Sequence, residues 1–237
     1  MKAQGFRPSE KFPTRFEKQI GIYPVYIDFL VERMPATQGT AMVDDIPANI
    51  LPGIDRALAT ARLVTIGGTD LFGAQQKLTV RVCEVGAFLV LKLRAFARRQ
   101  QPKDAFDILY TLMHYDRGLV VATAAFAEEG VAKNPAFAEA LECLKLQFQT
   151  ENAPGPVRSS YFVFGEVLAG ESADIRLRRL QVQQDAVSLA AALLAATAII
   201  PLANAQQAQA PAAAPAAKGD HGDKSGIPPY VPNLNTM

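Results

Sequence analysis

The chain has 237 residues, of which 49% are hydrophobic, and this is enough for one core or for two small domains. The net charge is +1, so no overall field favours nucleic acid or a membrane surface, and any basic site has to be local. Two cysteines, Cys83 and Cys143, lie far apart and match no metal-binding spacing. A reduced, cytoplasmic compartment is therefore expected. The sequence has only two histidines, so a histidine-rich metal site is not expected.

Residues 1–20 are polar and basic, and they lack the apolar core of a secretory signal. The next stretch, Ile22–Val31, is rich in aromatic and β-branched residues and predicts a strand that is covered on both faces. Asp28 lies near the end of this strand and has two interpretations. It either accepts hydrogen bonds from the backbone of the next turn, or it is a metal-binding or basic carboxylate at a sheet edge.

Two further strands are expected over Ala61–Ile66 and Lys77–Cys83, after a loop and a short helix that begins near Arg56. The residues between these strands have the composition of a hairpin loop. The loop begins with Gly67-Gly68, which would suit a phosphate group only in a strand–glycine–helix order. That order is missing in the sequence, so the hairpin is the preferred interpretation.

The stretch Lys92–Asp107 is the most informative part of the sequence. It predicts the end of one helix, a short break and the start of a second helix. At about 100° per residue, Lys92 and Arg99 fall on one stripe of the first helix. Arg94 and Arg98 fall on the opposite side. The stripe of Lys92 also carries Phe88, Ala95 and Phe96. Burying a cation among aromatic residues is unfavourable unless an anion or a cleft receives it.

The second helix is expected over Asp104–Tyr115, where apolar residues recur at helical spacing. Asp104 fits the N-cap of this helix, and Asp107 follows it at the spacing of a capping box. This interpretation accounts for Asp104, but it explains neither Lys92 nor Lys103.

The C-terminal half predicts further helices. They are expected over Ala132–Gln149, Ser159–Leu168 and Asp174–Leu194, and Leu119–Phe126 is either a helix or a strand. The apolar run Val187–Ala203 falls short of the roughly 20 residues of a comfortable membrane span. An extension of the last core helix is therefore preferred over a weak membrane anchor or a sequence fused from a neighbouring reading frame.

One motif is more specific than these patterns. It reads Lys92-x-x-Ala95-x-x-x-Arg99-x-x-x-Lys103-Asp104-x-x-Asp107, followed by Ile108 and Leu112. The motif resembles the C-terminal signature of the AbiEii/AbiGii-type nucleotidyltransferase toxins, which belong to the DNA polymerase β-like nucleotidyltransferase superfamily. Shorter segments also resemble that family, at Gly5-Phe6, Arg15-Phe16 and Val25–Leu30.

The resemblance implies the toxin of a type IV toxin–antitoxin or phage-defence system, which transfers a nucleotide to RNA or protein. A nucleoside triphosphate would be the substrate, Mg²⁺ the cofactor and an antitoxin protein a partner. Asp28 would be the metal-binding and catalytic carboxylate. Lys92 would bind phosphate and, with Asp104, take part in catalysis. The remaining nucleotide-binding residues would be Arg99, Lys103 and Asp107. Lys103, Asp104 and Asp107 would complete the cleft from the second helix, as charge partners or as positioning groups.

The chain departs from the family at the first motif, a Gly-Ser or Gly-Gly turn followed by an Asp-x-Asp pair. This motif should precede Asp28, and no such pair occurs before the C-terminal tail. Two-metal nucleotidyl transfer lacks its main ligands without the pair. We therefore expect impaired activity, as in a chain that begins after the motif. The alternative is a non-catalytic remnant that binds a nucleotide, RNA or an antitoxin.

The expected architecture is α+β. A partial nucleotidyltransferase domain with a small mixed sheet would cover residues 1–86, and a helical domain would cover residues 87–198. The Ala/Pro-rich tail, residues 199–237, predicts disorder. The polar N-terminus and the short apolar run together favour a cytoplasmic protein without a membrane partner.

Overall fold

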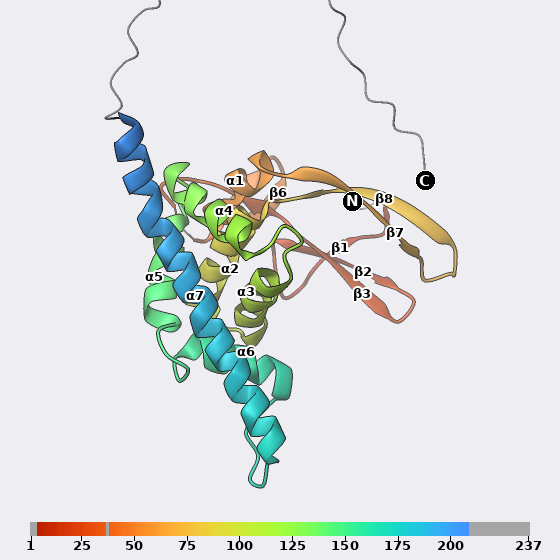
Figure 1. Ribbon diagram of the computed structural model, residues 1–237. Coiled ribbons are helices and arrows are strands. Elements are labelled where there is room, and N and C mark those ends of the chain that lie inside the picture. Colours follow the sequence, from red (N-terminus) through yellow and green to blue (C-terminus); the bar gives the residue numbers. More distant parts are fainter. Residues whose placement is uncertain (1–3, 37, 209–237) are drawn as a thin grey trace, which may run out of the picture.

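The computed structural model describes residues 4–36 and 38–208, with side chains described to residue 198. Helices form a bundle on one side of the molecule, and the strands form three small sheets beside it (Figure 1). The predicted α+β class is confirmed.

The strands come first in the chain and form two three-stranded sheets and a hairpin. The first sheet is antiparallel and contains β1 (Arg7–Pro8), β2 (Arg15–Ile20) and β3 (Tyr23–Asp28). The second sheet is mixed and contains β4 (Leu30–Val31), β6 (Ile46–Ile50) and β5 (Thr40–Val43), in this spatial order. The hairpin contains β7 (Arg62–Thr69) and β8 (Gln75–Val82). The small mixed sheet that the sequence predicts is the second sheet, whereas Asp28 belongs to the first, antiparallel sheet.

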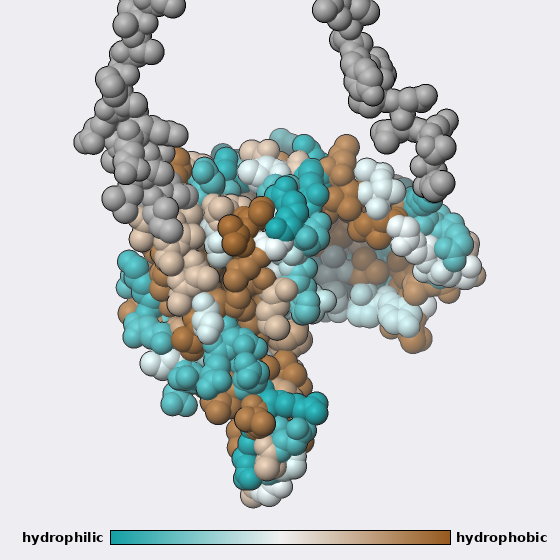
Figure 2. All heavy atoms as spheres, in the orientation of Figure 1, coloured by the Kyte–Doolittle hydropathy of each residue, from teal (hydrophilic) through white to brown (hydrophobic). Residues whose placement is uncertain are grey.

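The strand β3 is less buried than the sequence predicts. Tyr23 is 54% exposed and Tyr26 is 51% exposed. The expectation of two covered faces is wrong, because β3 is the edge strand of a small sheet that projects beside the bundle (Figure 1). Figure 2 shows apolar surface, in brown, over the strand hairpins on the right of the molecule. The most exposed of these apolar side chains are Ile22, Leu63, Leu71, Phe72 and Leu78.

The region before residue 54 contains strands where a loop was expected. Asp44-Asp45 forms the turn between β5 and β6, with Asp44 in the left-handed region at a φ of 51°, which aspartate tolerates. Pro47 lies within β6, where a proline is generally unfavourable. It is tolerated because β4 pairs only with Asn49 and Ile50, so that Pro47 has a strand neighbour on one side alone. The predicted short helix follows as α1 (Ile54–Ala59).

The helical half is built around one central helix. In the described part of the chain, its six helices are α2 (Val85–Arg99), α3 (Pro102–His114), α4 (Leu119–Val131), α5 (Phe137–Gln147), α6 (Pro154–Phe164) and α7 (Ala173–Ala208). The central helix, α2, packs against α3, α4 and α5. Leu89, Leu93 and Phe96 of α2 are fully buried, and Phe126 and Leu144 meet them from α4 and α5. Residues 119–126, for which the sequence allowed either a helix or a strand, are helical.

Close packing of α2 on α4 depends on Gly86. A Cβ atom at this position would lie 2.2 Å from the carbonyl oxygen of Ala125. Backbone cannot retreat as a flexible side chain does, so a larger residue would force the two helices apart.

The last helix, α7, runs along the front of the bundle (Figure 1). Ala190 and Leu193 join the core, so the apolar run that begins at Val187 extends the last core helix, as preferred from the sequence. The helix continues to Ala208, beyond the expected end of the helical domain at residue 198. Within residues 4–36 and 38–208, none of the helices combines the length and the hydrophobicity that a membrane span requires. Residues 209–237, for which the sequence predicts disorder, lie outside the described residues.

A buried ion pair joins the strand half to the bundle. Arg56 of α1 donates to both carboxylate oxygens of Glu129 in α4, at 3.0 and 3.1 Å. The Glu129 side chain is 4% exposed and also accepts a hydrogen bond from Asn134. The hydrogen bond to Glu129 raises the pKa of Arg56. This pair is structural, because its geometry fully occupies the buried carboxylate.

Candidate functional site

The helices α2 and α3 form a hairpin that brings the Lys92–Asp107 motif together. The end of α2 is closed by Gln100, which adopts a φ of 47° and donates its N–H to the oxygen of Phe96 at 2.8 Å. Pro102 then occupies the first turn of α3, where a missing N–H is not a loss. The tight turn therefore holds the last turns of α2 against the first turns of α3.

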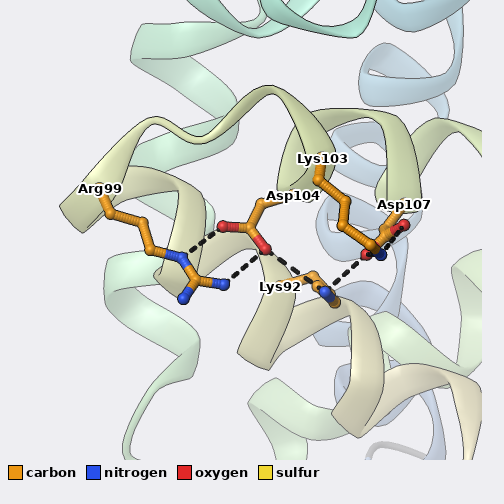
Figure 3. A network of polar contacts seen from close by, with 5 residues as sticks. All are labelled: Lys92, Arg99, Lys103, Asp104 and Asp107. Atoms are coloured by element: carbon orange, nitrogen blue, oxygen red, sulfur yellow. Dashed lines mark hydrogen bonds and ion pairs between the residues drawn. The ribbon is translucent and has the colours of Figure 1, made fainter. Parts of the chain in front are cut away.

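Asp104 lies at the centre of this contact and is 1% exposed. Its two oxygens accept from Nε and Nη2 of Arg99, at 2.6 and 2.8 Å (Figure 3). Its Oδ1 also accepts from Nζ of Lys92, at 3.3 Å. A bidentate arginine–carboxylate pair is among the strongest ion-pair geometries, and it offsets the unfavourable burial of the carboxylate.

Asp107 extends the network along α3. It accepts from Nζ of Lys92 at 2.6 Å and from Nζ of Lys103 at 2.7 and 2.9 Å. We call these five residues the α2–α3 charge cluster, and in order of contact they are Arg99, Asp104, Lys92, Asp107 and Lys103. Three cations against two carboxylates leave the cluster with a surplus of one positive charge.

The capping interpretation of Asp104 is wrong. The N-cap of α3 is Gln101, and no side-chain hydrogen bond caps this end. Asp104 lies within the first turn, with its carboxylate directed to Arg99 and Lys92 rather than to the free backbone N–H groups. Its negative charge still lies near the positive end of the helix dipole. Asp104 accepts from two charged donors of α2, and these hydrogen bonds are stronger than those from the neutral backbone N–H groups that a cap would bind.

The pKa shifts in the cluster follow from these contacts. The hydrogen bond to Asp104 raises the pKa of Arg99 above its ordinary value. Burial acts to raise the pKa of Asp107, but the hydrogen bonds from Lys103 and Lys92 outweigh it and leave the pKa below its usual range. Both groups are therefore charged at neutral pH.

The cluster is closed on the side of Asp104 and open on the side of its outer cations. The Arg99 side chain is 59% exposed and that of Lys103 is 66% exposed, whereas Lys92 is 23% exposed. In Figure 3, the third guanidinium nitrogen of Arg99 points away from Asp104. Exposed cations held in place by buried Asp104 and partly buried Asp107 are suited to bind a phosphate or another oxyanion.

Lys92 also contacts the aromatic residue predicted to share its stripe, since its Nζ lies 5.8 Å from the centre of the Phe88 ring. The opposite side of α2 carries Arg94 and Arg98, as helical spacing predicts. Arg94 is 4% exposed and pairs with Glu139 of α5 at 3.0 Å. Glu139 also binds Arg98. Sequence reasoning missed this pair because helical periodicity does not show that α2 is covered from several sides.

Asp28 lies apart from the charge cluster in its contacts. It faces Arg15 across the β2–β3 register, and its oxygens accept from Nε and Nη2 of Arg15 at 2.8 and 2.9 Å. The hydrogen bond from Arg15 lowers the pKa of Asp28. Among the residues that the structure describes, no hydrogen bond or ion pair links Asp28 to Lys92 or to the rest of the cluster.

The donor set around Asp28 does not fit Mg²⁺. This ion prefers several oxygen ligands in near-octahedral geometry, and both oxygens of Asp28 already accept from a guanidinium. In the part of the chain that the structure describes, no three His, Cys, Asp or Glu side chains gather in a way that could hold a metal ion. No reaction step is therefore derived through a metal.

Gly67 and Gly68 belong to the strand β7, paired with Lys77 and Gln76 of β8, and not to a loop. The hairpin turn comes later, at Asp70, whose Oδ1 accepts from the backbone N–H groups of Phe72 and Ala74 at 2.9 Å. Gln76 reinforces this turn, and its hydrogen bond is the main cause of the lowered pKa of Asp70. The predicted hairpin is confirmed, and its glycines carry no phosphate-binding geometry.

The two cysteines are free thiols, and neither belongs to the cluster. Cys143 is buried in the core, and burial raises the pKa of its thiol to about 12. Burial also raises the pKa of Cys83. A thiol with a raised pKa is a poor nucleophile and a poor metal ligand.

The structure thus brings together five of the six predicted site residues and leaves Asp28 in an ion pair of its own. Comparison with known protein families, curated proteins and solved structures gave no match.

Proposed function

We propose that the protein is a nucleotidyltransferase-like member of the toxin–antitoxin and phage-defence class, and that its α2–α3 charge cluster binds the phosphates of a nucleoside triphosphate. The observation that carries the proposal is the preorganised set of cations, in which buried Asp104 fixes both Lys92 and Arg99. Preorganised cations stabilise phosphate charge without reorganising as it develops.

In nucleotidyl transfer, a hydroxyl oxygen of the acceptor attacks the α-phosphorus of the triphosphate. The bond from this phosphorus to the bridging oxygen breaks, the acceptor proton is released, and pyrophosphate leaves. Arg99, Lys92 and Lys103 would bind the β- and γ-phosphates, where negative charge accumulates. Asp104 and Asp107 would position these cations, and this is the role that we assign to Asp104 in place of a catalytic one.

The cluster supports binding more directly than it supports catalysis. A general base must accept a proton, and the pKa of Asp28 is lowered by the guanidinium of Arg15. The second candidate function is therefore a non-catalytic module that binds a nucleotide, RNA or an antitoxin through the same cluster. Occupation of both Asp28 oxygens by Arg15 favours this candidate.

Cytoplasm is the compartment that we propose for either function, because nucleoside triphosphates and RNA are present there. The two free cysteines support it.

The test combines labelled nucleoside triphosphates, Mg²⁺ and total RNA or protein with the purified chain. Incorporation that disappears in Asp28→Ala supports transfer, with Lys145→Ala, an exposed lysine of α5, as the matched control. Nucleotide-dependent thermal stabilisation that is lost in Lys92→Ala, without incorporation, supports the binding module. If no nucleoside triphosphate stabilises or labels the system, nucleotidyl transfer and nucleotide binding both fail.

A further inference from the structure

A continuous ladder of four aromatic rings crosses the surface where α3 meets α6. Phe106 and Phe162 stack with ring centres 4.8 Å apart and planes inclined by 26°. On α3, Phe106 is followed by Tyr110, at 5.8 Å, and Tyr110 by His114, at 4.4 Å. The ladder therefore runs from one helix to the next without a gap between neighbouring rings.

The ladder is open to solvent for most of its length. Tyr110 is 54% exposed and Phe162 is 45% exposed, and His114 is also exposed. Only Phe106, between the two helices, is half-buried. Large aromatic rings in a row that keep half of their surface in water have faces available to a ligand.

The ladder begins beside the α2–α3 charge cluster. On a helix, residues three and four apart share a face. Lys103 and Asp107 therefore lie on the stripe of α3 that continues through Tyr110 and His114. Lys103 and the rings of Tyr110 and His114 therefore share one face of α3.

A second cation flanks the ladder from α6. Arg158 lies one turn before Phe162, so that both residues share a face of this helix. It is exposed, and among the described residues it makes no side-chain hydrogen bond or ion pair. The ladder is thus bordered by Lys103 on one helix and by Arg158 on the other.

From this arrangement we propose that the α3–α6 ring ladder binds single-stranded nucleic acid, with bases stacked on the rings and phosphates bound by Lys103 and Arg158. The inference rests on the proposed function, to which it adds a place for the bases of an acceptor strand. Rows of exposed aromatic rings bordered by cations are the arrangement that binds single strands without a fixed sequence.

Charge complementarity favours nucleic acid over a protein partner. A protein that covered the rings would have to provide apolar side chains for the ring faces and carboxylates for two separate cations. A single strand offers both, because each nucleotide pairs one flat base with one phosphate. Arginine can stack on bases in addition to binding phosphate.

The test measures binding of fluorescent single-stranded RNA and DNA of about twelve nucleotides by anisotropy, without any nucleoside triphosphate. We expect the wild-type chain to bind, and Tyr110→Ala to weaken binding on the order of tenfold. Tyr110→Phe, which keeps the ring, should retain wild-type affinity. Phe72→Ala removes an aromatic residue that is 89% exposed at the distant β7–β8 turn, and it serves as the matched control. Arg158→Gln should reduce the dependence of affinity on salt.

RNA bound more tightly than DNA identifies an RNA strand, and equal binding identifies stacking without recognition of the ribose; both support the ladder. Failure to bind, or equal losses in Tyr110→Ala and Phe72→Ala, would overturn it. A wild-type dimer that binds no nucleic acid and that dissociates in Tyr110→Ala would also overturn the proposal, because the rings would then form a contact between two copies of the chain. This assay contains no nucleoside triphosphate, so it tests the ladder alone. Failure of the proposed function would instead be seen as absent triphosphate binding in the experiments with Lys92→Ala.

Discussion

Two carboxylates in this protein have the same ion-pair geometry in different surroundings. Asp104 and Asp28 each accept two hydrogen bonds from Nε and Nη2 of one arginine, at 2.6 to 2.9 Å. The Asp104 side chain is 2% exposed, whereas that of Asp28 is 40% exposed. Geometry alone therefore does not determine what an ion pair contributes, because water competes for Asp28 and not for Asp104. The two halves of the molecule differ in the same way, since the helical bundle is packed and buried whereas the strand hairpins are exposed to solvent.

The largest expected effect comes from Asp104→Asn. The substitution keeps the shape of the side chain but leaves Lys92 and Arg99 without their shared buried anion, and we expect a loss of about 3 kcal/mol in the free energy of unfolding. Urea denaturation followed by circular dichroism measures this loss. A loss of less than about 1 kcal/mol in the free energy of unfolding, as expected for an exposed ion pair, would contradict this. It would show that water reaches Lys92 and Arg99 and replaces the carboxylate.

A second comparison uses glycines of the two halves. Gly86→Ala should destabilise the protein by about 2 kcal/mol, since its Cβ would meet the backbone of Ala125. Gly67→Ala is the control, because a Cβ there meets nothing within 4 Å. Melting temperatures of the two variants check the contrast, and an equal decrease would contradict the packing of α2 on α4.

The exposed pair should matter much less. Asp28→Asn is expected to change the free energy of unfolding by less than about 1 kcal/mol, because exposed ion pairs contribute roughly that much or less. The same urea denaturation applies. A loss equal to that of Asp104→Asn would remove the difference between the buried and the exposed carboxylate.

The smallest expected effect is a change in pH dependence. The folded-state pKa of Asp107 lies below its ordinary value of 3.8. Its contribution to stability is therefore complete above that value and is lost as pH falls through the lower, folded-state pKa. Asp107→Asn should flatten the acid limb of the stability profile below about pH 4. An unchanged acid limb, measured by denaturation at several pH values, would show that Asp107 is not stabilised by Lys92 and Lys103.

The sequence predicted the local elements of this fold better than their surroundings. Helical spacing identified the hairpin of α2 and α3, and aromatic and β-branched residues identified β3. Periodicity does not say how many neighbours an element has. For this reason the pairing of Arg94 with Glu139 of α5 was not predicted, and β3 was expected to be covered although Tyr26 is exposed.

The candidate site was predictable as far as its residues are close in sequence. Lys92, Arg99 and Asp104 belong to one helical hairpin; spacing placed Lys92 and Arg99 on one stripe, and the resemblance added Asp104. Asp28 was singled out by its place near a strand end, but its partner Arg15 follows from a strand register that the sequence does not specify. The capping alternative for Asp104 was wrong, because an aspartate near a helix start fits a cap equally well until the neighbouring helix is placed.

The central claim is that the α2–α3 charge cluster binds triphosphate, and calorimetric titration of nucleoside triphosphate into the purified protein tests it most directly. We expect saturable binding by the wild-type chain and by Lys145→Ala, and a loss on the order of tenfold or more in Lys92→Ala and Arg99→Gln, because each removes a charge-assisted contact to phosphate. Circular dichroism of each variant establishes that it is folded. Folded Lys92→Ala and Arg99→Gln proteins that bind as tightly as the wild type, or a wild-type chain that binds no nucleoside triphosphate, would contradict the claim.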